Sequence, residues 1–212
     1  IGVGSRYQAM GEASVATAND VYSMFWNPAG LASVENTTIG FTNVNWVLDI
    51  NLNYVGLAKN FEGLGVLGVS ATVLSMGDQE ITTFEEQEGT GDTYSASSYA
   101  IGLTYARMLT ARFAFGGSVK YIGERIHLER SSGFAFDFGT LLNTGFRSLR
   151  LGMSITNMGP EMKFDGPSLG LRYDDDQGPG EPVPVDLKVT PYNLPMRFRV
   201  GLAYDVDFSP KA

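Results

Sequence analysis

The chain has 212 residues, a formal net charge of −8 and no cysteine. The acidic balance argues against a nucleic-acid-binding protein, because no cluster of Lys and Arg is present to neutralise phosphates. The absence of cysteine excludes a disulfide scaffold and thiolate metal sites. The 26 Gly, 13 Phe and 10 Tyr are typical of a β-protein with tight turns and large outward side chains.

No run of about 18 apolar residues occurs, so no transmembrane helix is predicted. The chain begins at Ile1 without Met, which we interpret as a mature chain whose signal peptide has been removed. Strands that cross a membrane give a much weaker pattern, alternating segments of about ten residues. The strand pattern therefore has to decide the class.

Residues 1–36 are small, polar and Ala-rich and show little β pattern. They contain the sequence Trp26-Asn27-Pro28-Ala29-Gly30. Pro28 fixes its φ angle and lacks a backbone donor, Gly30 permits a tight bend, and Asn27 can hydrogen-bond to nearby backbone. These residues predict a fixed turn. Two interpretations of the whole segment remain open, a packed element and a flexible leader.

From Thr37 onwards the hydrophobic pattern has a period of two, which predicts β-strands. We expect eight of them, at about 37–47, 51–61, 64–75, 94–108, 111–124, 132–143, 147–157 and 195–207. The alternation is clearest at 111–124, where Phe113, Phe115 and Tyr121 share one face. The opposite faces of the strands carry the candidate interior charges Arg112, Lys120, Asp137, Arg150, Arg197, Arg199 and Asp205.

The predicted connections alternate in length. Those at 62–63, 109–110 and 143–146 are short, and those at 76–93, 125–131 and 158–194 are longer; the last is expected to hold a small hairpin around 168–173. This alternation is typical of an outer-membrane β-barrel with short turns at one end and loops at the other. A soluble β-sandwich also alternates, but it would not usually place Phe or Tyr at so many successive positions of one face.

The interior charges have two interpretations. They line a channel that favours anions, or they pair with one another and hold the N-terminal segment, which we favour because ions facing a barrel interior are normally paired. Aromatic residues are expected to form girdles at the membrane interfaces. The candidates are Trp46, Tyr54, Tyr99, Tyr105, Tyr121 and Tyr204, whereas Trp26 is expected to pack within the N-terminal segment.

Motifs for catalysis are weak. His127 is the single histidine, and no Gly-x-Ser-x-Gly motif accompanies it, so we predict a loop histidine in a protein that is not an enzyme. The acidic runs at 85–88 and 174–176 lack the spacing of an EF-hand loop and are interpreted as solvated loops. No phosphate-binding glycine motif is present. No cofactor and no metal site are predicted.

A series of motifs in chain order carries a family resemblance. It consists of Arg6, Met10-Gly11, the Ala-rich run to Asp20, Trp26 to Leu31, Trp46 with Asp49-Ile50, Tyr54 to Ala58, Leu74 to Asp78, Val119 to Ile122, and Arg199 to Tyr204. The series resembles the FadL-like outer-membrane β-barrels, and most closely their PorV/PorQ branch. The resemblance implies an all-β, antiparallel transmembrane barrel in the outer membrane of a Gram-negative-type bacterium.

In the family that the chain resembles, the segment equivalent to 1–36 is a plug inside the barrel, with Trp26, Asn27, Pro28, Ala29 and Gly30 as its hatch motif. Residues 37–212 would form the wall. The family has about fourteen strands, whereas an eight-stranded barrel has an interior just filled by side chains. We therefore expect this chain to form part of a larger barrel.

Two functions follow from the resemblance. The branch serves type IX protein secretion, in which the barrel associates with the secretion translocon and binds cargo proteins through the loops at 76–93 and 158–194. The wider family transports hydrophobic small molecules, which requires an apolar cavity between plug and wall. A cargo-binding barrel requires no such tunnel. Outer-membrane lipid is the expected surrounding in both cases.

Overall fold

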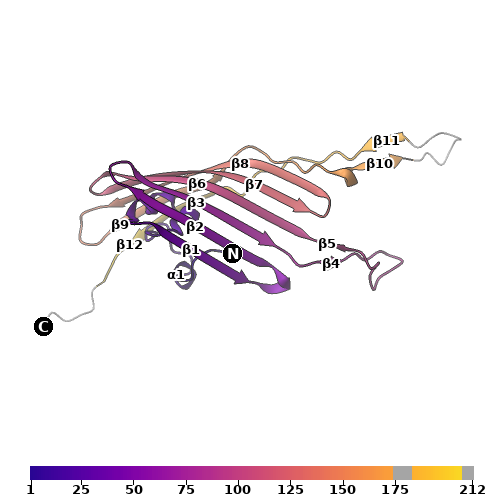
Figure 1. Cartoon of the computed structure of the whole chain (residues 1–212), viewed down its shortest axis with the longest axis horizontal. Coiled ribbons are helices and arrows are strands. Elements are labelled where there is room, and N and C mark those ends of the chain that lie inside the picture. Colours follow the sequence, from indigo (N-terminus) through magenta and orange to yellow (C-terminus); the bar gives the residue numbers. More distant parts are fainter. Residues whose placement is uncertain (174–182, 207–212) are drawn as a thin grey trace.

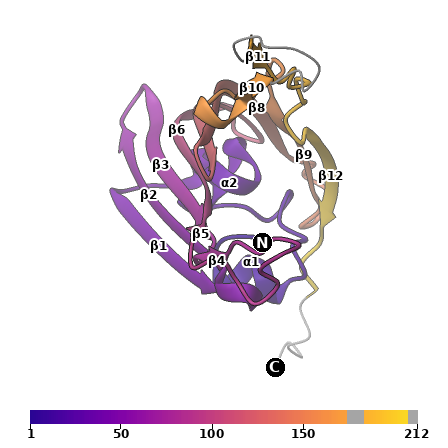
Figure 2. The ribbon, with the colours of Figure 1, turned by 90° about the vertical axis from the view of Figure 1, so that its right-hand side faces the viewer.

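The computed structural model describes residues 1–173 and 183–206. Its main element is an eight-stranded antiparallel sheet in which strands that follow each other along the chain lie side by side. The strands, in spatial order, are β1 (Thr38–Asn45), β2 (Asn51–Phe61), β3 (Gly65–Ser75), β6 (Ala96–Thr110), β7 (Phe113–Ile126), β8 (Glu129–Asn143), β9 (Arg150–Met158) and β12 (Arg197–Ala203). The sheet curves around the N-terminal segment (Figure 2).

The two ends of the sheet differ in their connections. Short connections at 62–64, 111–112 and 144–149 join the strands at one end, here called the turn end. Two small hairpins project from the other end, the loop end (Figure 1). These are β4 (Gln79–Glu80) with β5 (Thr93–Tyr94), and β10 (Gly170–Tyr173) with β11 (Val183–Asp186). A whole hairpin was expected around 168–173. These residues include only its first strand, β10, and the second strand, β11, comes later in the chain.

Several predicted boundaries were wrong. The connection expected at 125–131 is the two-residue turn of His127 and Leu128, because β7 and β8 extend to Ile126 and from Glu129. Their polar ends were interpreted as loop, although backbone pairing continues there. The last strand is shorter than 195–207, beginning after Pro195, which has no N–H to donate to a ladder.

The sheet is open. Within residues 1–173 and 183–206, β1 pairs only with β2 and β12 only with β9. The described residues therefore form no closed barrel, and the larger barrel of which the chain was expected to be a part stays a prediction. No helix in this described part is long and apolar enough to cross a membrane.

The N-terminal segment packs against the concave face of the sheet. It contains the short helices α1 (Ser5–Ala9) and α2 (Ser23–Trp26) and the 3₁₀-helix η1 (Pro28–Ser33). Val21, Met24 and Leu31 are buried against Ala58 and Ala106 of the sheet. The segment is thus a packed element, as one of the two interpretations of the sequence had it.

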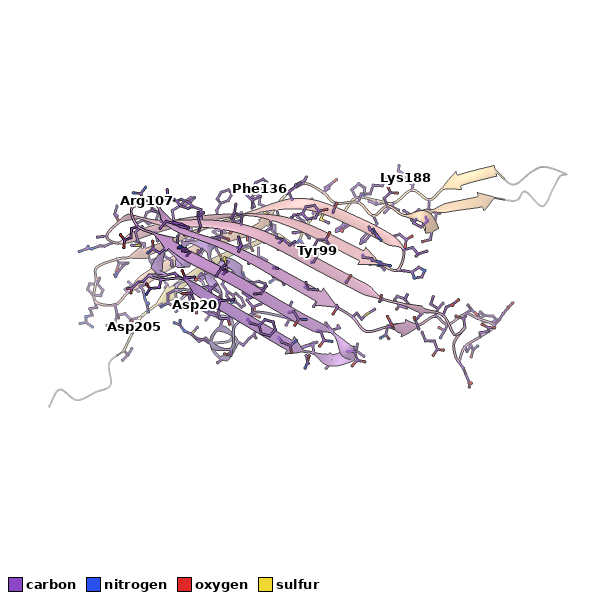
Figure 3. All side chains as sticks on the ribbon, in the orientation of Figure 1. Asp20, Tyr99, Arg107, Phe136, Lys188 and Asp205 are labelled. Carbon is purple, nitrogen blue, oxygen red and sulfur yellow. The ribbon has the colours of Figure 1, made fainter. Side chains whose placement is uncertain are left out.

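The two faces of the sheet carry different side chains. The convex face shows large apolar residues such as Phe41, Leu103 and Phe136, all exposed, and Figure 3 shows Tyr99 and Phe136 along it. The concave face carries many small residues, such as Gly116, Ala106 and Thr104. Tyr54 was wrongly placed in an aromatic girdle, because it lies on the concave face, is buried, and donates a hydrogen bond to the Val21 carbonyl at 3.2 Å.

Two further 3₁₀-helices lie in connections at the loop end. They are η2 (Val47–Asp49) between β1 and β2, and η3 (Pro167–Leu169) before β10. Trp46, next to η2, is 56% exposed. Tyr105 lies towards the turn end, where its hydroxyl donates to the Leu64 carbonyl at 2.6 Å.

Candidate functional site

Glycines line the concave face where the N-terminal segment contacts it. Every strand of the main sheet except β6 contributes one whose added Cβ would collide with that segment. They are Gly40, Gly56, Gly68, Gly116, Gly139, Gly152 and Gly201. On β6 the buried Thr104 and Ala106 take this place. We call this set the glycine socket; it brings the sheet backbone into direct contact with the segment.

The Asn27-Pro28 turn sits deepest in the glycine socket. A Cβ on Gly116 would lie 2.5 Å from the Pro28 carbonyl oxygen, and one on Gly139 would overlap Asn27 Oδ1. Van der Waals contact between such atoms requires more than about 3 Å. A larger residue would therefore displace the Pro28 backbone at position 116 and the Asn27 side chain at position 139. The close contact with the turn therefore requires glycine at positions 116 and 139.

Asn27 is fully buried, and both ends of its amide are used. Its Nδ2 donates to the Val15 carbonyl at 2.6 Å and to the Thr140 carbonyl of β8 at 3.1 Å. Its Oδ1 accepts from the Ala29 backbone N–H at 3.1 Å, which caps η1. The side chain thus joins two parts of the N-terminal segment to the sheet. The predicted turn exists, with the additional bond to β8.

Trp26 lies in an aromatic cluster of the N-terminal segment. Its Nε1 donates to the Val3 carbonyl at 2.9 Å, and its ring centroid is 6.0 Å from that of Tyr7. Burial, with a smaller contribution from the Asp20 carboxylate, raises the pKa of the Tyr7 phenol far above its ordinary value. The guanidinium carbon of Arg199 lies 5.3 Å from the Trp26 ring centroid, a cation–π contact that joins the segment to β12.

Lys120 and Asp137 form an ion pair on the concave face. Lys120 Nζ lies 2.8 Å from Asp137 Oδ2, and it donates to Asn157 Oδ1 at 2.5 Å. Asp137 is almost completely buried, and its Oδ1 accepts from the Asn157 backbone N–H at 2.8 Å. Asn157 has a positive φ of 61° at a bulge where the β8–β9 register shifts. The bulge turns this N–H towards the carboxylate, so the pair is fully hydrogen-bonded across three strands.

The other predicted interior charges lie apart from this pair. Arg112 is exposed in the turn between β6 and β7, and Arg150 pairs with Asp205 at 2.8 Å near the turn end. Arg197 and Arg199 lie on the concave side of β12 and make no ion pair with any described residue. The sequence grouped seven charges together, whereas the structure divides them between the interior and the turn-end rim.

A cavity of about 220 Å³ lies between the N-terminal segment and the concave face. Phe25 of the segment and Leu194 of the last long loop line it, together with Lys120, Arg197 and Arg199. It is smaller than the roughly 300–1,000 Å³ of ordinary small-molecule sites. Its lining combines apolar side chains with these three cations and with the carboxylate of Glu124.

Of the remaining candidates, the structure describes His127 and the acidic run at 85–88. His127 has a positive φ of 53° in the β7–β8 turn, and its backbone N–H donates to the Ser95 carbonyl at 2.9 Å. Within the described part of the chain, no cluster of three His, Cys, Asp or Glu is placed to hold a metal ion. The acidic run at 174–176 lies outside the described residues.

Comparison with protein families identifies this arrangement. The model of the type IX secretion system protein PorV matches residues 1–170. The chain belongs to the PorV family. The match includes the N-terminal segment, the Asn27-Pro28 turn and every strand from β1 to β9. PorV proteins are components of a secretion system, so membership associates the chain with the secretion machinery. No match was found among curated proteins or among solved structures.

Sequence reasoning missed the glycine socket and Asn157. A signal for the socket was present, because the seven glycines occur at inward-facing positions of successive predicted strands. Asn157 gave no comparable signal, since the bulge depends on the pairing of β8 with β9. Both features belong to the part of the PorV-family chain that contacts or faces the N-terminal segment.

Proposed function

We propose that the chain forms most of the wall of an outer-membrane β-barrel that binds cargo proteins during type IX secretion. The N-terminal segment would be the plug of that barrel. Further strands would pair with β1 and β12, because an open edge leaves backbone N–H and C=O groups unsatisfied, which lipid does not tolerate. Family membership and the exposed apolar convex face support this proposal.

The convex face has the composition expected for contact with lipid. Exposed apolar side chains follow one another along β6, β7 and β8, whereas soluble monomers rarely expose contiguous apolar patches larger than a few hundred Å². On β7 the apolar positions run from Phe113 to Tyr121, about 26 Å along the strand at about 3.3 Å per residue. The length of this stretch agrees with the roughly 9–11 residues with which a tilted strand crosses the apolar core of a membrane.

The loop between β4 and β5 is the strongest candidate for the cargo-binding surface. The proposed binding role depends mainly on the composition of this loop and on its exposed aromatic residue. The stretch 76–93, which includes β4 and the loop to β5, contains six acidic residues and no Lys or Arg. Phe84 is 93% exposed, although its neighbours are held by backbone hydrogen bonds from Ile81 to Asp92 and from Thr90 to Ile81, both at 2.8 Å. An ordered aromatic tip ringed by carboxylates suits a partner with an apolar pocket and a basic rim.

Transport of hydrophobic small molecules, the alternative function, finds less support. It requires an apolar path between plug and wall. The cavity at this place is small and is lined by Lys120, Arg197 and Arg199. A cavity of this size, with charged side chains among its apolar ones, gives transport little support.

The binding role can be tested by shortening the loop. Because Glu80 and Thr93 are cross-strand partners, residues 81–92 can be replaced by Asn-Gly, a sequence that favours the tight type I′ hairpin turn. We expect this variant to reach the outer membrane and to co-purify far less secreted cargo than the parent protein. Phe84→Ser should give a smaller loss of the same kind.

Arg147→Ser, in the turn at 144–149, is the matched control at the opposite end. It should leave cargo recovery unchanged. Full cargo recovery with the shortened loop would refute the role of the loop. If the shortened-loop variant lost uptake of a hydrophobic compound and kept full cargo recovery, transport would be the better-supported function.

A further inference from the structure

A cluster of cations lies at the loop end of the convex face. Arg125 of β7 and Arg130 of β8 are direct cross-strand partners, and both are exposed. Lys163, from the segment after β9, lines the same surface cavity of about 480 Å³. Like charges directly opposite each other destabilise a sheet. The arrangement is unexpected in a chain of net charge −8 unless an anion binds there.

The protein compensates these charges only in part. None of the three cations forms an ion pair with a described residue. Asp165 lies opposite Arg130, but its Oδ1 accepts from the Gly166 backbone N–H at 3.0 Å. Glu124 also borders the cavity and accepts from the Tyr192 hydroxyl at 2.6 Å.

The cation cluster lies beyond a group of aromatic residues on the same strands. Directly below it, Tyr99 and Tyr121 lie with ring centroids 6.1 Å apart, and Phe134 follows at 5.4 Å from Tyr121. Tyrosines of this kind mark the level of the lipid headgroups. Arg125 is four residues beyond Tyr121, about 13 Å along the strand at about 3.3 Å per residue. From this position its long side chain can reach back towards the headgroup layer above the apolar band.

We propose that Arg125, Arg130 and Lys163 bind the phosphate group of an anionic membrane lipid. Two guanidinium groups offer planar forks of donors that match phosphate oxygens, and Lys163 adds a point charge. Ser97 and Ser132 line the same cavity and supply hydroxyl donors. The inference rests on the proposed function, because it requires the convex face to lie in the bilayer.

The test uses the whole protein in phosphatidylcholine nanodiscs that contain lipid A, a phosphate-bearing glycolipid, with lipid retention measured by native mass spectrometry. Arg125→Gln combined with Arg130→Gln should lower retention about tenfold or more, because two of the three charges that attract the phosphate are removed. Lys59→Gln combined with Arg107→Gln is the matched control, because these two exposed cations lie at the turn end of the convex face. This control should retain lipid A as the parent does.

Dephosphorylated lipid A should be retained poorly by all variants. Equal retention by the Arg125/Arg130 variant and the parent, or an equal loss in the turn-end control, would overturn the proposal. Displacement of lipid A by the same concentration of inorganic phosphate would indicate a site for the free ion and would also overturn it. Failure of the parent protein to insert into nanodiscs would instead refute the membrane placement itself.

Discussion

The two faces of the main sheet use the same strands for opposite purposes. On the convex face, Phe115 and Val119 of β7 are exposed, and between them on the concave side Gly116 and Ser118 are buried. A water-soluble sheet places its large apolar residues on the buried face. Here the large residues face outwards and the small ones contact the N-terminal segment. The N-terminal segment, and not a second layer of large side chains, therefore fills the space on the concave side of the sheet.

The largest effect is expected where the concave face carries a buried charge. Asp137→Ala leaves Lys120 without its partner, and breaking a buried pair costs about 3–5 kcal/mol. Asp205→Ala breaks the exposed pair with Arg150 and should cost about 0–1 kcal/mol. Urea unfolding in detergent, followed by tryptophan fluorescence, measures both. Similar losses for the two variants would show that the concave face is not shielded from solvent.

A charge placed on the convex face should have the next largest effect. If the convex face lies in the membrane as proposed above, Phe136→Arg puts a cation into the apolar band, at a cost of about 2–4 kcal/mol near its middle. Phe136→Leu keeps the site apolar and should cost much less. The folded fraction in phosphatidylcholine bilayers measures the difference. Equal folding of the two variants would mean that this face contacts water.

The glycine socket offers a comparison of two adjacent residues. Gly116→Leu would collide with Pro28, whereas Gly117→Leu projects from the convex face, where an added Cβ has no neighbour closer than 3.6 Å. We expect Gly116→Leu to weaken docking of residues 1–36 by about 1–3 kcal/mol, so that a protease cleaves the segment faster. If Gly117→Leu exposes the segment equally, the socket does not hold it.

The smallest effect concerns pH. Because the folded-state pKa of Tyr7 is raised, the stability linked to its neutral form is complete below its ordinary pKa of about 10 and declines as the pH rises above that value. Fluorescence of Trp26, whose ring lies beside Tyr7, should therefore change only well above about pH 10. The Tyr7→Phe variant should lack this part of the change. An identical titration in the variant would assign the change to other groups.

Much of the fold was predictable because it depends on local patterns. The period of two located all eight strands of the main sheet, and the Pro28 and Gly30 signals located the turn. Strand ends were less predictable, since Arg125 and Arg130 continue a ladder that only backbone pairing reveals. Tyr54 was misplaced because an aromatic residue fits either the lipid-facing side or the packed N-terminal segment.

The candidate site was harder to predict for a physical reason. The bond from Asn27 to the Thr140 carbonyl joins residues that are 113 positions apart, and the Lys120–Asp137 pair is completed by a bulge at Asn157. Sequence spacing does not contain such long-range geometry. It did place Lys120, Asp137, Arg197 and Arg199 on the face opposite the aromatic residues, where the structure has them.

The most direct test of the central claim is to compare adjacent residues of β3 in a bilayer. The chain has no cysteine, so single cysteines at Val69, Val73, Ser70 and Thr72 can each carry one spin label. Val69 and Val73 are exposed on the convex face, and Ser70 and Thr72 line the inner cavity. We predict that labels at the two valines collide with oxygen dissolved in lipid and are shielded from a water-soluble nickel complex, whereas labels at Ser70 and Thr72 are shielded from lipid. Equal access of the nickel complex to all four labels would contradict the account.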